Sequence, residues 1–128
     1  MFEVLSQLTK APKPTRKEFE EFFSRQQQSN SKAIHIIGLE RKTDKIIAMG
    51  SVILVNTVLQ GKLGKIENIV TCKSVRGKGL GKIIIEVLKD ECWREQCNVI
   101  GLYCETHNVK FYEKLGFKSE GIIKVCYK

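Results

Sequence analysis

The sequence has little of what marks secreted, metal-binding or membrane proteins. Among its 128 residues are only two prolines, one tryptophan and two histidines. No apolar run approaches the ~20 residues that a membrane-spanning helix needs. The first 22 residues lack the basic start, apolar core and small-residue cleavage site of a signal peptide. We therefore expect a cytoplasmic protein with no membrane partner.

The cysteines form neither a disulfide pattern nor a metal-binding pattern. No two of them make a Cys-x-x-Cys pair, and neither histidine has a ligand spacing relative to them. Because their number is odd and no secretion signal precedes them, we expect free thiols, most of them buried as small apolar side chains. The sequence thus predicts no metal site among Cys72, Cys92, Cys97, Cys104 and Cys126.

Acidic residues are also few, at 14 against 22 lysines and arginines, which gives a formal charge of +8. A basic chain is typical of proteins that bind nucleic acids, phosphorylated metabolites or nucleotide cofactors. The alternative is that the basic side chains only keep the surface soluble. A non-enzymatic nucleic-acid-binding module is disfavoured. The single tryptophan, Trp93, lies in a helical stretch, and no basic strand with interleaved aromatic residues is present.

Residues 1–128 read as one domain, because no repeat or Pro/Gly/Ser-rich linker divides them. Thr15 and Glu18 make a capping box before a helix whose Phe19, Phe22 and Phe23 share a face that we expect to be core. The predicted strands are 32–42, 46–55, 65–72, 98–104 and 117–128, with a glycine-containing loop at 60–65. Further helices are expected over 80–96, where Ile84, Val87, Leu88 and Cys92 share one face, and over 107–116, ending at Gly116.

This order favours an α/β or α+β three-layer domain, in which a mixed central sheet is flanked by helices. The early strands follow one another directly, which favours antiparallel pairing over a doubly wound sheet.

The stretch "VRGKGLGK" (75–82) stands between a predicted strand and a predicted helix. Glycines at 77, 79 and 81 let a backbone approach a ligand closely, and the helix N-terminus favours an anion. Arg76, Lys78 and Lys82 add full positive charges. The spacing is not that of a Walker loop, and the position after several strands disfavours a dinucleotide-binding unit. An ordinary strand-to-helix turn is the alternative explanation.

Two motifs resemble the GNAT acetyltransferase superfamily. Arg76-Gly77-Lys78-Gly79-Leu80-Gly81 is similar to the loop that binds the pyrophosphate of acetyl-coenzyme A. "NVKFYEKLGF" (108–117) resembles the superfamily's downstream Asn…Tyr…Gly-Phe region. The resemblance implies the GNAT acyl-CoA N-acyltransferase fold and an acetyl-CoA-dependent N-acetyltransferase.

Within that superfamily, "FEVLSQLT", "KIENIV" and "NVKFYEKLGFKSEG" are similar to segments of the glucosamine-6-phosphate N-acetyltransferases, and together they span nearly the whole chain. This resemblance implies transfer of acetyl from acetyl-CoA to the amine of D-glucosamine 6-phosphate, a step toward UDP-N-acetylglucosamine. It also implies a homodimer whose last strand lies near the partner. Another amine, such as a protein N-terminus or a polyamine, is the alternative acceptor, and the basic charge disfavours a polyamine.

The resemblance also assigns roles around the cofactor. The backbone of Ile69 and Val70 would hold the pantetheine and polarise the acetyl carbonyl, as backbone N–H groups can. Asn108 would hydrogen-bond the cofactor, and Lys114 would lie near its phosphates. Tyr112 would stand beside the thioester sulfur, where a phenol of pKa ~10 can donate a proton to a thiolate whose acid has a pKa of ~8.5. Packing of the last helix is the alternative role for Tyr112.

On the acceptor side, Glu67 and Thr9 match positions in the substrate pocket, and Glu67 would orient the amine. Three positions depart from the family pattern. Asn68 replaces an aspartate, and Tyr103 stands where the family usually has an acidic residue. Tyr127 aligns with the terminal arginine that meets the sugar phosphate, so neighbouring Lys128 would substitute for it.

Overall fold

The computed structural model describes residues 15–28 and 31–128. Its helices and strands, with two short 3-10 turns (η), are α2 (Arg16–Gln28), β1 (Lys32–Leu39), β2 (Ile46–Thr57), β3 (Gly61–Thr71), η1 (Lys73–Val75), α3 (Leu80–Arg94), β4 (Val99–Leu102), η2 (Thr106–Asn108) and α4 (Val109–Glu113). No helix in the described ranges is both long and apolar enough to cross a membrane.

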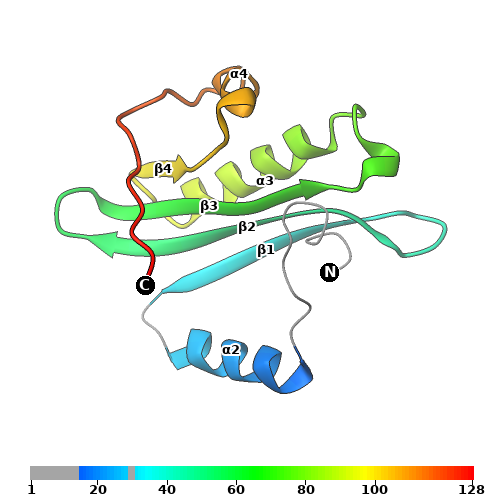
Figure 1. Cartoon of the computed structure of the whole chain (residues 1–128), viewed down its shortest axis with the longest axis horizontal. Helices are drawn as coiled ribbons and strands as arrows, with labels where there is room; N and C mark the ends of the chain where they lie inside the picture. The colour runs from blue at the N-terminus through cyan, green and yellow to red at the C-terminus, as the bar shows by residue number, and fades with distance from the viewer. Residues whose placement is uncertain (1–14, 29–30) are drawn as a thin grey trace.

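The four strands form one mixed sheet in the order β1-β2-β3-β4 (Figure 1). β1 pairs with β2 and β2 with β3 in antiparallel fashion, whereas β3 and β4 run parallel. A parallel pair needs a crossover connection, and α3 supplies it. The prediction of a mixed sheet with helices is therefore confirmed.

The main core lies between α3 and the β1–β3 part of the sheet, which α3 contacts. Ile84, Leu88 and Cys92 of α3 are buried as expected, but the fourth buried residue is Ile85, and Val87 is only half-buried. Gly50 of β2 allows this close packing. A Cβ atom at Gly50 would lie 2.5 Å from side-chain atoms of Ile69 and Ile84.

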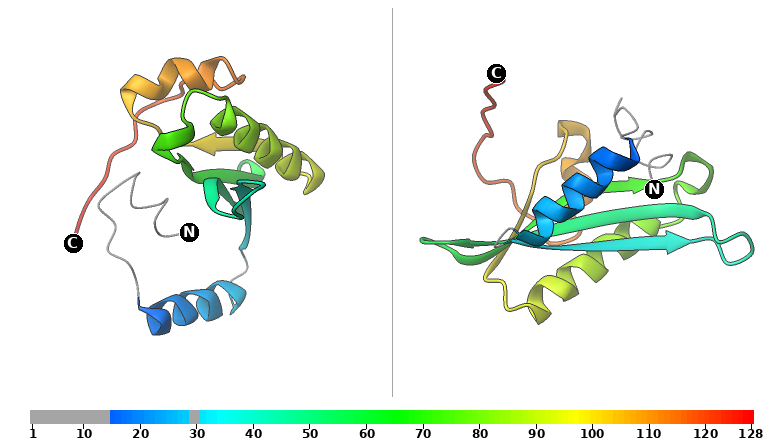
Figure 2. Two further views of the ribbon diagram at one scale, coloured as in Figure 1. Left: turned by 90° about the vertical axis from the view of Figure 1, so that its right-hand side faces the viewer. Right: turned by 90° about the horizontal axis from the view of Figure 1, so that it is seen from below.

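Helix α2 begins as the sequence predicts. The Thr15 backbone N–H donates to Glu18 Oε2 at 2.8 Å, and the Glu18 N–H donates to Thr15 Oγ1 at 3.2 Å, which completes the capping box. The prediction that these phenylalanines form a core face is wrong for Phe22, whose side chain is 49% exposed. Phe19 is half-buried. The physical reason is the position of α2, which lies along the β1 edge of the sheet rather than over its core (Figures 1 and 2).

The strand predicted over 117–128 is wrong for this single chain. These residues form no strand, and Ile123, Val125 and Tyr127 are 60%, 63% and 87% exposed. A strand needs a neighbour for its backbone groups, and no strand of the described residues pairs with this C-terminal segment. The loop expected at 60–65 is also shorter than predicted, because β3 already begins at Gly61.

Candidate active site

The candidate site begins where β3 and β4 part. β4 pairs with β3 only from Leu63↔Val99 to Ile66↔Leu102, while β3 continues to Thr71. From residue 67 onward, that side of β3 faces no strand in the described part of the chain. The backbone groups of 67–71 on this edge are therefore placed to pair with a ligand, as a strand edge does with an added peptide. We call this opening the β3–β4 fork.

A β-bulge lies in β3 where the fork opens. Asn68 has a φ of +56°, in the left-handed region that asparagine tolerates, and the β2–β3 register shifts between Met49 and Ser51. The bulge also changes which side chains face α3. Ile66 and Ile69 pack into the α3-side core, whereas Glu67, paired with Ser51, lies on the opposite face.

The predicted anion loop follows the end of β3. Gly77 and Gly79 have φ values of +82° and +78°, which favour glycine, and a Cβ at either would meet nothing within 4 Å. The loop is therefore open, and Gly79 is the N-cap of α3. Arg76, Lys78 and Lys82 are exposed around it.

The electrostatics of this loop suit an anion. The first turn of α3 contains no acidic residue, so nothing there opposes the positive end of the helix dipole. Arg76 Nε donates to the carbonyl of Thr71 at 3.1 Å, which ties the side chain back to the end of β3. The loop cations and the free strand edge are thus adjacent parts of one site.

Helix α4 closes the other side of the fork. Phe111 Cζ lies 3.6 Å from where a Cβ of Gly81 would stand, so α4 approaches the first turn of α3. Asn108 precedes α4, and its side chain makes no capping hydrogen bond. Lys114 is exposed at the helix end.

Tyr112 is held by its neighbours. Its ring packs edge-to-face on Phe111 and Phe117, with centroid distances of 5.1 and 5.9 Å. Burial, and next the nearby Cys104 thiol, raise the pKa of Tyr112 above its usual range. The phenol therefore keeps its proton at neutral pH and can act as a donor.

Three predicted acceptor-side residues remain. Tyr103 directly follows Leu102, the last residue of β4, so it stands where the fork opens, and it is 63% exposed. Lys128 ends the C-terminal segment, away from the fork in its own chain (Figure 1). Thr9 lies outside the described residues.

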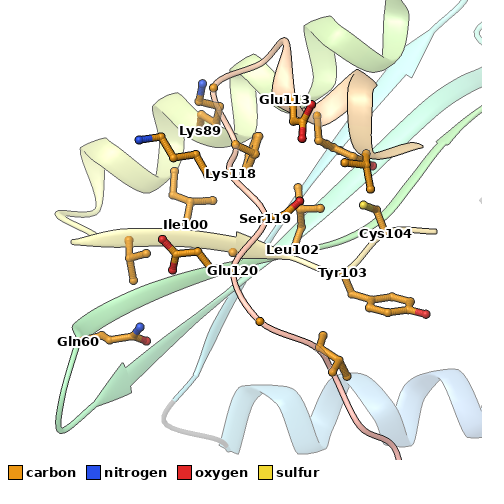
Figure 3. A pocket seen from close by; sticks show the side chains of 18 of the residues that line it. Gln60, Lys89, Ile100, Leu102, Tyr103, Cys104, Glu113, Lys118, Ser119 and Glu120 are labelled. Carbon is orange, nitrogen blue, oxygen red and sulfur yellow. The ribbon is translucent and has the colours of Figure 1, made fainter. Parts of the chain in front are cut away.

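A pocket of about 650 Å³ lies beside the fork, between β4, α4 and the C-terminal segment (Figure 3). Of the predicted site residues, only Tyr103 and Tyr112 line it. The pocket therefore belongs to the free outer edge of β4 and not to the anion loop. In the ranges that the structure covers, three or more His, Cys, Asp or Glu side chains nowhere gather as a metal site would require.

Sequence reasoning missed two polar residues near Glu67. Ser51 is only 3% exposed in β2, and its Oγ lies 2.7 Å from His35 Nδ1 of β1. Ser51 is also the register partner of Glu67. A serine within a long apolar strand was the only available signal, and its partners depend on a register that the sequence does not state.

Comparison with known proteins places these features in a family. Residues 2–117 match the family model described as "Acetyltransferase (GNAT) family". The chain is 40% identical over 127 residues to glucosamine 6-phosphate N-acetyltransferase 1 of Dictyostelium discoideum, covering 98% of this chain and 80% of the relative. It is 35% identical over 122 residues to the glucosamine 6-phosphate N-acetyltransferase of Arabidopsis thaliana, covering 94% and 82% of the two chains.

Solved structures agree. The crystal structure of the glucosamine-6-phosphate N-acetyltransferase from Arabidopsis thaliana is similar with a TM-score of 0.88 at 35% identity, over 98% of this chain and 86% of that one. An acetyltransferase of Trypanosoma brucei is similar with a TM-score of 0.87 at 26% identity, over 98% and 89%.

Proposed function

The chain belongs to the GNAT acetyltransferase family and, within it, to the glucosamine-6-phosphate N-acetyltransferases, so we propose that it acetylates the amine of D-glucosamine 6-phosphate. Acetyl-CoA, the co-substrate of this family, supplies the acetyl group. The product would be the N-acetyl sugar phosphate used toward UDP-N-acetylglucosamine. The observation that carries the proposal is the open cationic loop at the α3 N-terminus, directly beside the unpaired edge of β3.

In this proposal the pyrophosphate of acetyl-CoA meets the anion loop. The residues involved are Arg76, Gly77, Lys78, Gly79, Leu80 and Gly81. Backbone N–H groups at a helix N-terminus and side-chain cations together stabilise phosphate charge. Lys114, on the exposed end of α4, adds a further cation near the phosphates.

The free edge of β3 holds the pantetheine arm. The backbone of Ile69 and Val70 pairs with its amide groups and polarises the acetyl carbonyl where negative charge develops. Asn108, whose side chain makes no capping bond, donates a hydrogen bond to the cofactor from the opposite wall.

Two side chains carry the acid–base chemistry. Glu67 orients the sugar amine, which attacks the acetyl carbonyl as its neutral form. Tyr112 donates a proton to the departing sulfur. The proton that the amine loses as it becomes an amide returns to the Tyr112 phenolate, so the enzyme ends the reaction in the form in which it began. Asn68, Tyr103 and Thr9 would complete the acceptor pocket beside Glu67.

The experiment that tests the function is a panel of amine acceptors assayed for thiol release from acetyl-CoA. Glucosamine 6-phosphate should be the best acceptor, and glucosamine without phosphate is the matched control. A peptide N-terminus and a polyamine represent the other amine classes. If one of these is preferred, the acceptor assignment fails and only the acetyltransferase activity remains.

We also propose a homodimer in the cytoplasm. The exposed apolar side chains of the C-terminal segment favour association with a partner. Lys128 lies away from its own fork, so a dimer would let it serve the site of the partner instead. No disulfide joins any of the five cysteines, all of which lie in the described ranges, and this fits a reducing compartment.

A further inference from the structure

Three polar residues lie in one row across the sheet, on the face opposite α3. His35 of β1 is in register with Ser51 of β2, and Ser51 is in register with Glu67 of β3. Side chains at directly opposed positions have Cβ atoms ~4.5–5.5 Å apart, close enough to interact. The proposed mechanism uses only Glu67, at one end of this row.

The middle of the row is buried and the far end is not. Ser51 is 3% exposed, so its hydroxyl needs a partner within the protein. His35 is exposed, and its Nδ1 lies 2.7 Å from Ser51 Oγ. A serine hydroxyl has one proton, so the direction of this hydrogen bond decides what Ser51 can do on its other side.

If the Nδ1–H of His35 donates to Ser51 Oγ, the proton of the hydroxyl is free to point toward Glu67. If Ser51 donates to Nδ1 instead, it can offer Glu67 no proton. Glu67 already has one partner, since Lys65 Nζ lies 3.2 Å from its Oε1. Its second oxygen can accept from another donor, and Ser51 is the neighbour in register with it.

We propose that His35 and Ser51 are positioning residues, which hold the Glu67 carboxylate in the orientation that receives the sugar amine. The inference rests on the proposed function, because it concerns how Glu67 meets the acceptor. His35 acts only through Ser51, and Ser51 acts only through Glu67. Neither residue touches acetyl-CoA, since both lie on β1 and β2, beyond β3 from the fork.

The test is steady-state kinetics with varied glucosamine 6-phosphate and varied acetyl-CoA. Ser51→Ala and His35→Ala should each raise KM for the sugar phosphate roughly tenfold, the low end for a lost hydrogen bond to a charged group. KM for acetyl-CoA should stay unchanged. His35→Asn keeps a donor near the position of Nδ1, so its KM for the sugar phosphate should rise much less than that of His35→Ala. Ile37→Ala is the matched control, because Ile37 is 45% exposed on the same face of β1.

A double-mutant cycle separates positioning from mere packing. In a Glu67→Gln background, Ser51→Ala should add little, because no charged carboxylate remains to be oriented. Full additivity of the two changes, or a rise in both KM values, would overturn the inference while leaving the proposed function intact. An unmodified enzyme that does not acetylate glucosamine 6-phosphate would overturn the proposed function, and the inference would fall with it.

Discussion

At the scale of single residues, burial raises the pKa of the Tyr112 phenol. The ring is packed between two phenylalanines, and its pKa is raised first by burial and then by the Cys104 thiol. Glu67 instead lies half-buried, with Lys65 Nζ 3.2 Å from its Oε1. The two side chains suit different roles, since the Tyr112 hydroxyl can donate a proton and the Glu67 carboxylate can accept hydrogen bonds.

Tyr112→Phe tests the donor. The substitution keeps the ring contacts with Phe111 and Phe117 and removes only the hydroxyl. We expect kcat to fall roughly 10²-fold, the low end for a general acid, with little change in affinity for acetyl-CoA. Single-turnover measurements decide the point. A rate near that of the unmodified enzyme would show that water or the substrate protonates the sulfur.

Glu67→Gln and Tyr103→Phe test the acceptor side. Loss of the Glu67 charge should raise KM for glucosamine 6-phosphate or lower kcat, since a hydrogen bond to a charged group contributes ~1.5–3 kcal/mol. Tyr103 is 63% exposed and can offer only a hydroxyl, so its loss should cost less. The assignment is falsified if Tyr103→Phe abolishes turnover while Glu67→Gln is silent.

Cysteine labelling tests the core beneath α3. Burial, and next the neighbouring Cys97, raise the pKa of Cys92 from its usual 9.0 to about 12. At pH 8 the native protein should leave Cys92 unlabelled by a maleimide, while exposed Cys126 reacts quickly. The Cys92 thiol ionises easily only in the unfolded state. Its contribution to the free energy of unfolding is therefore complete below pH 9 and is lost as the pH rises toward 12. Mass spectrometry after labelling identifies the modified residues, and rapid native labelling of Cys92 would contradict the structure.

At the scale of elements, the turn from β3 into α3 carries the proposed cofactor site. Gly79 is the N-cap of α3 at a φ of +78°, and the space beside it is open. A side chain can therefore fit there without a clash, so its effect on the cofactor depends on its charge and on the space that the phosphates themselves need.

Gly79→Asp compared with Gly79→Asn isolates that charge. Both residues tolerate the left-handed conformation better than other side chains, so the two variants should have similar unfolding temperatures. The aspartate places a negative charge where phosphate is expected, and it should weaken acetyl-CoA binding at least tenfold more than asparagine does. Calorimetry measures both affinities. If the two variants bind acetyl-CoA with equal affinity, the loop is not part of the cofactor site.

The sequence predicted those features of the fold that depend only on residues close together in the chain. The capping box of Thr15 and Glu18, the glycine loop before α3 and the stop at Gly116 all depend on residues a few positions apart, and the structure has each of them. The bulge at Asn68 could not be predicted, because it depends on how β2 and β3 pair. The same is true of the row from His35 to Glu67, which only the strand register brings together.

At the scale of the whole molecule, the C-terminal segment (117–128) has the sequence pattern of a strand, but no described strand pairs with it. Ile123, Val125 and Tyr127 alternate with polar or small residues, which is the period of a strand with one apolar face. All three are well exposed, and the segment stands apart from the free edge of β4 across the pocket of Figure 3. The sequence pattern thus predicts a strand for which the described residues offer no paired neighbour, and a second copy of the chain is the neighbour that we propose.

Ile123→Ser combined with Val125→Ser tests whether a second copy of the chain is that neighbour. Burial of these side chains at an interface would stabilise a dimer by ~25 cal/mol for each Å² of apolar surface removed from water. The double variant should therefore sediment as a monomer at concentrations where the unmodified protein sediments as a dimer. Leu59→Ser is the control, because Leu59 is 96% exposed in the β2–β3 turn and should leave assembly unchanged. If Lys128 serves the site of the partner, the monomeric variant should also show a raised KM for glucosamine 6-phosphate and an unchanged KM for acetyl-CoA. A monomeric unmodified protein with full activity would contradict both the dimer and the role of Lys128, and it would leave the fork of each single chain as a complete active site.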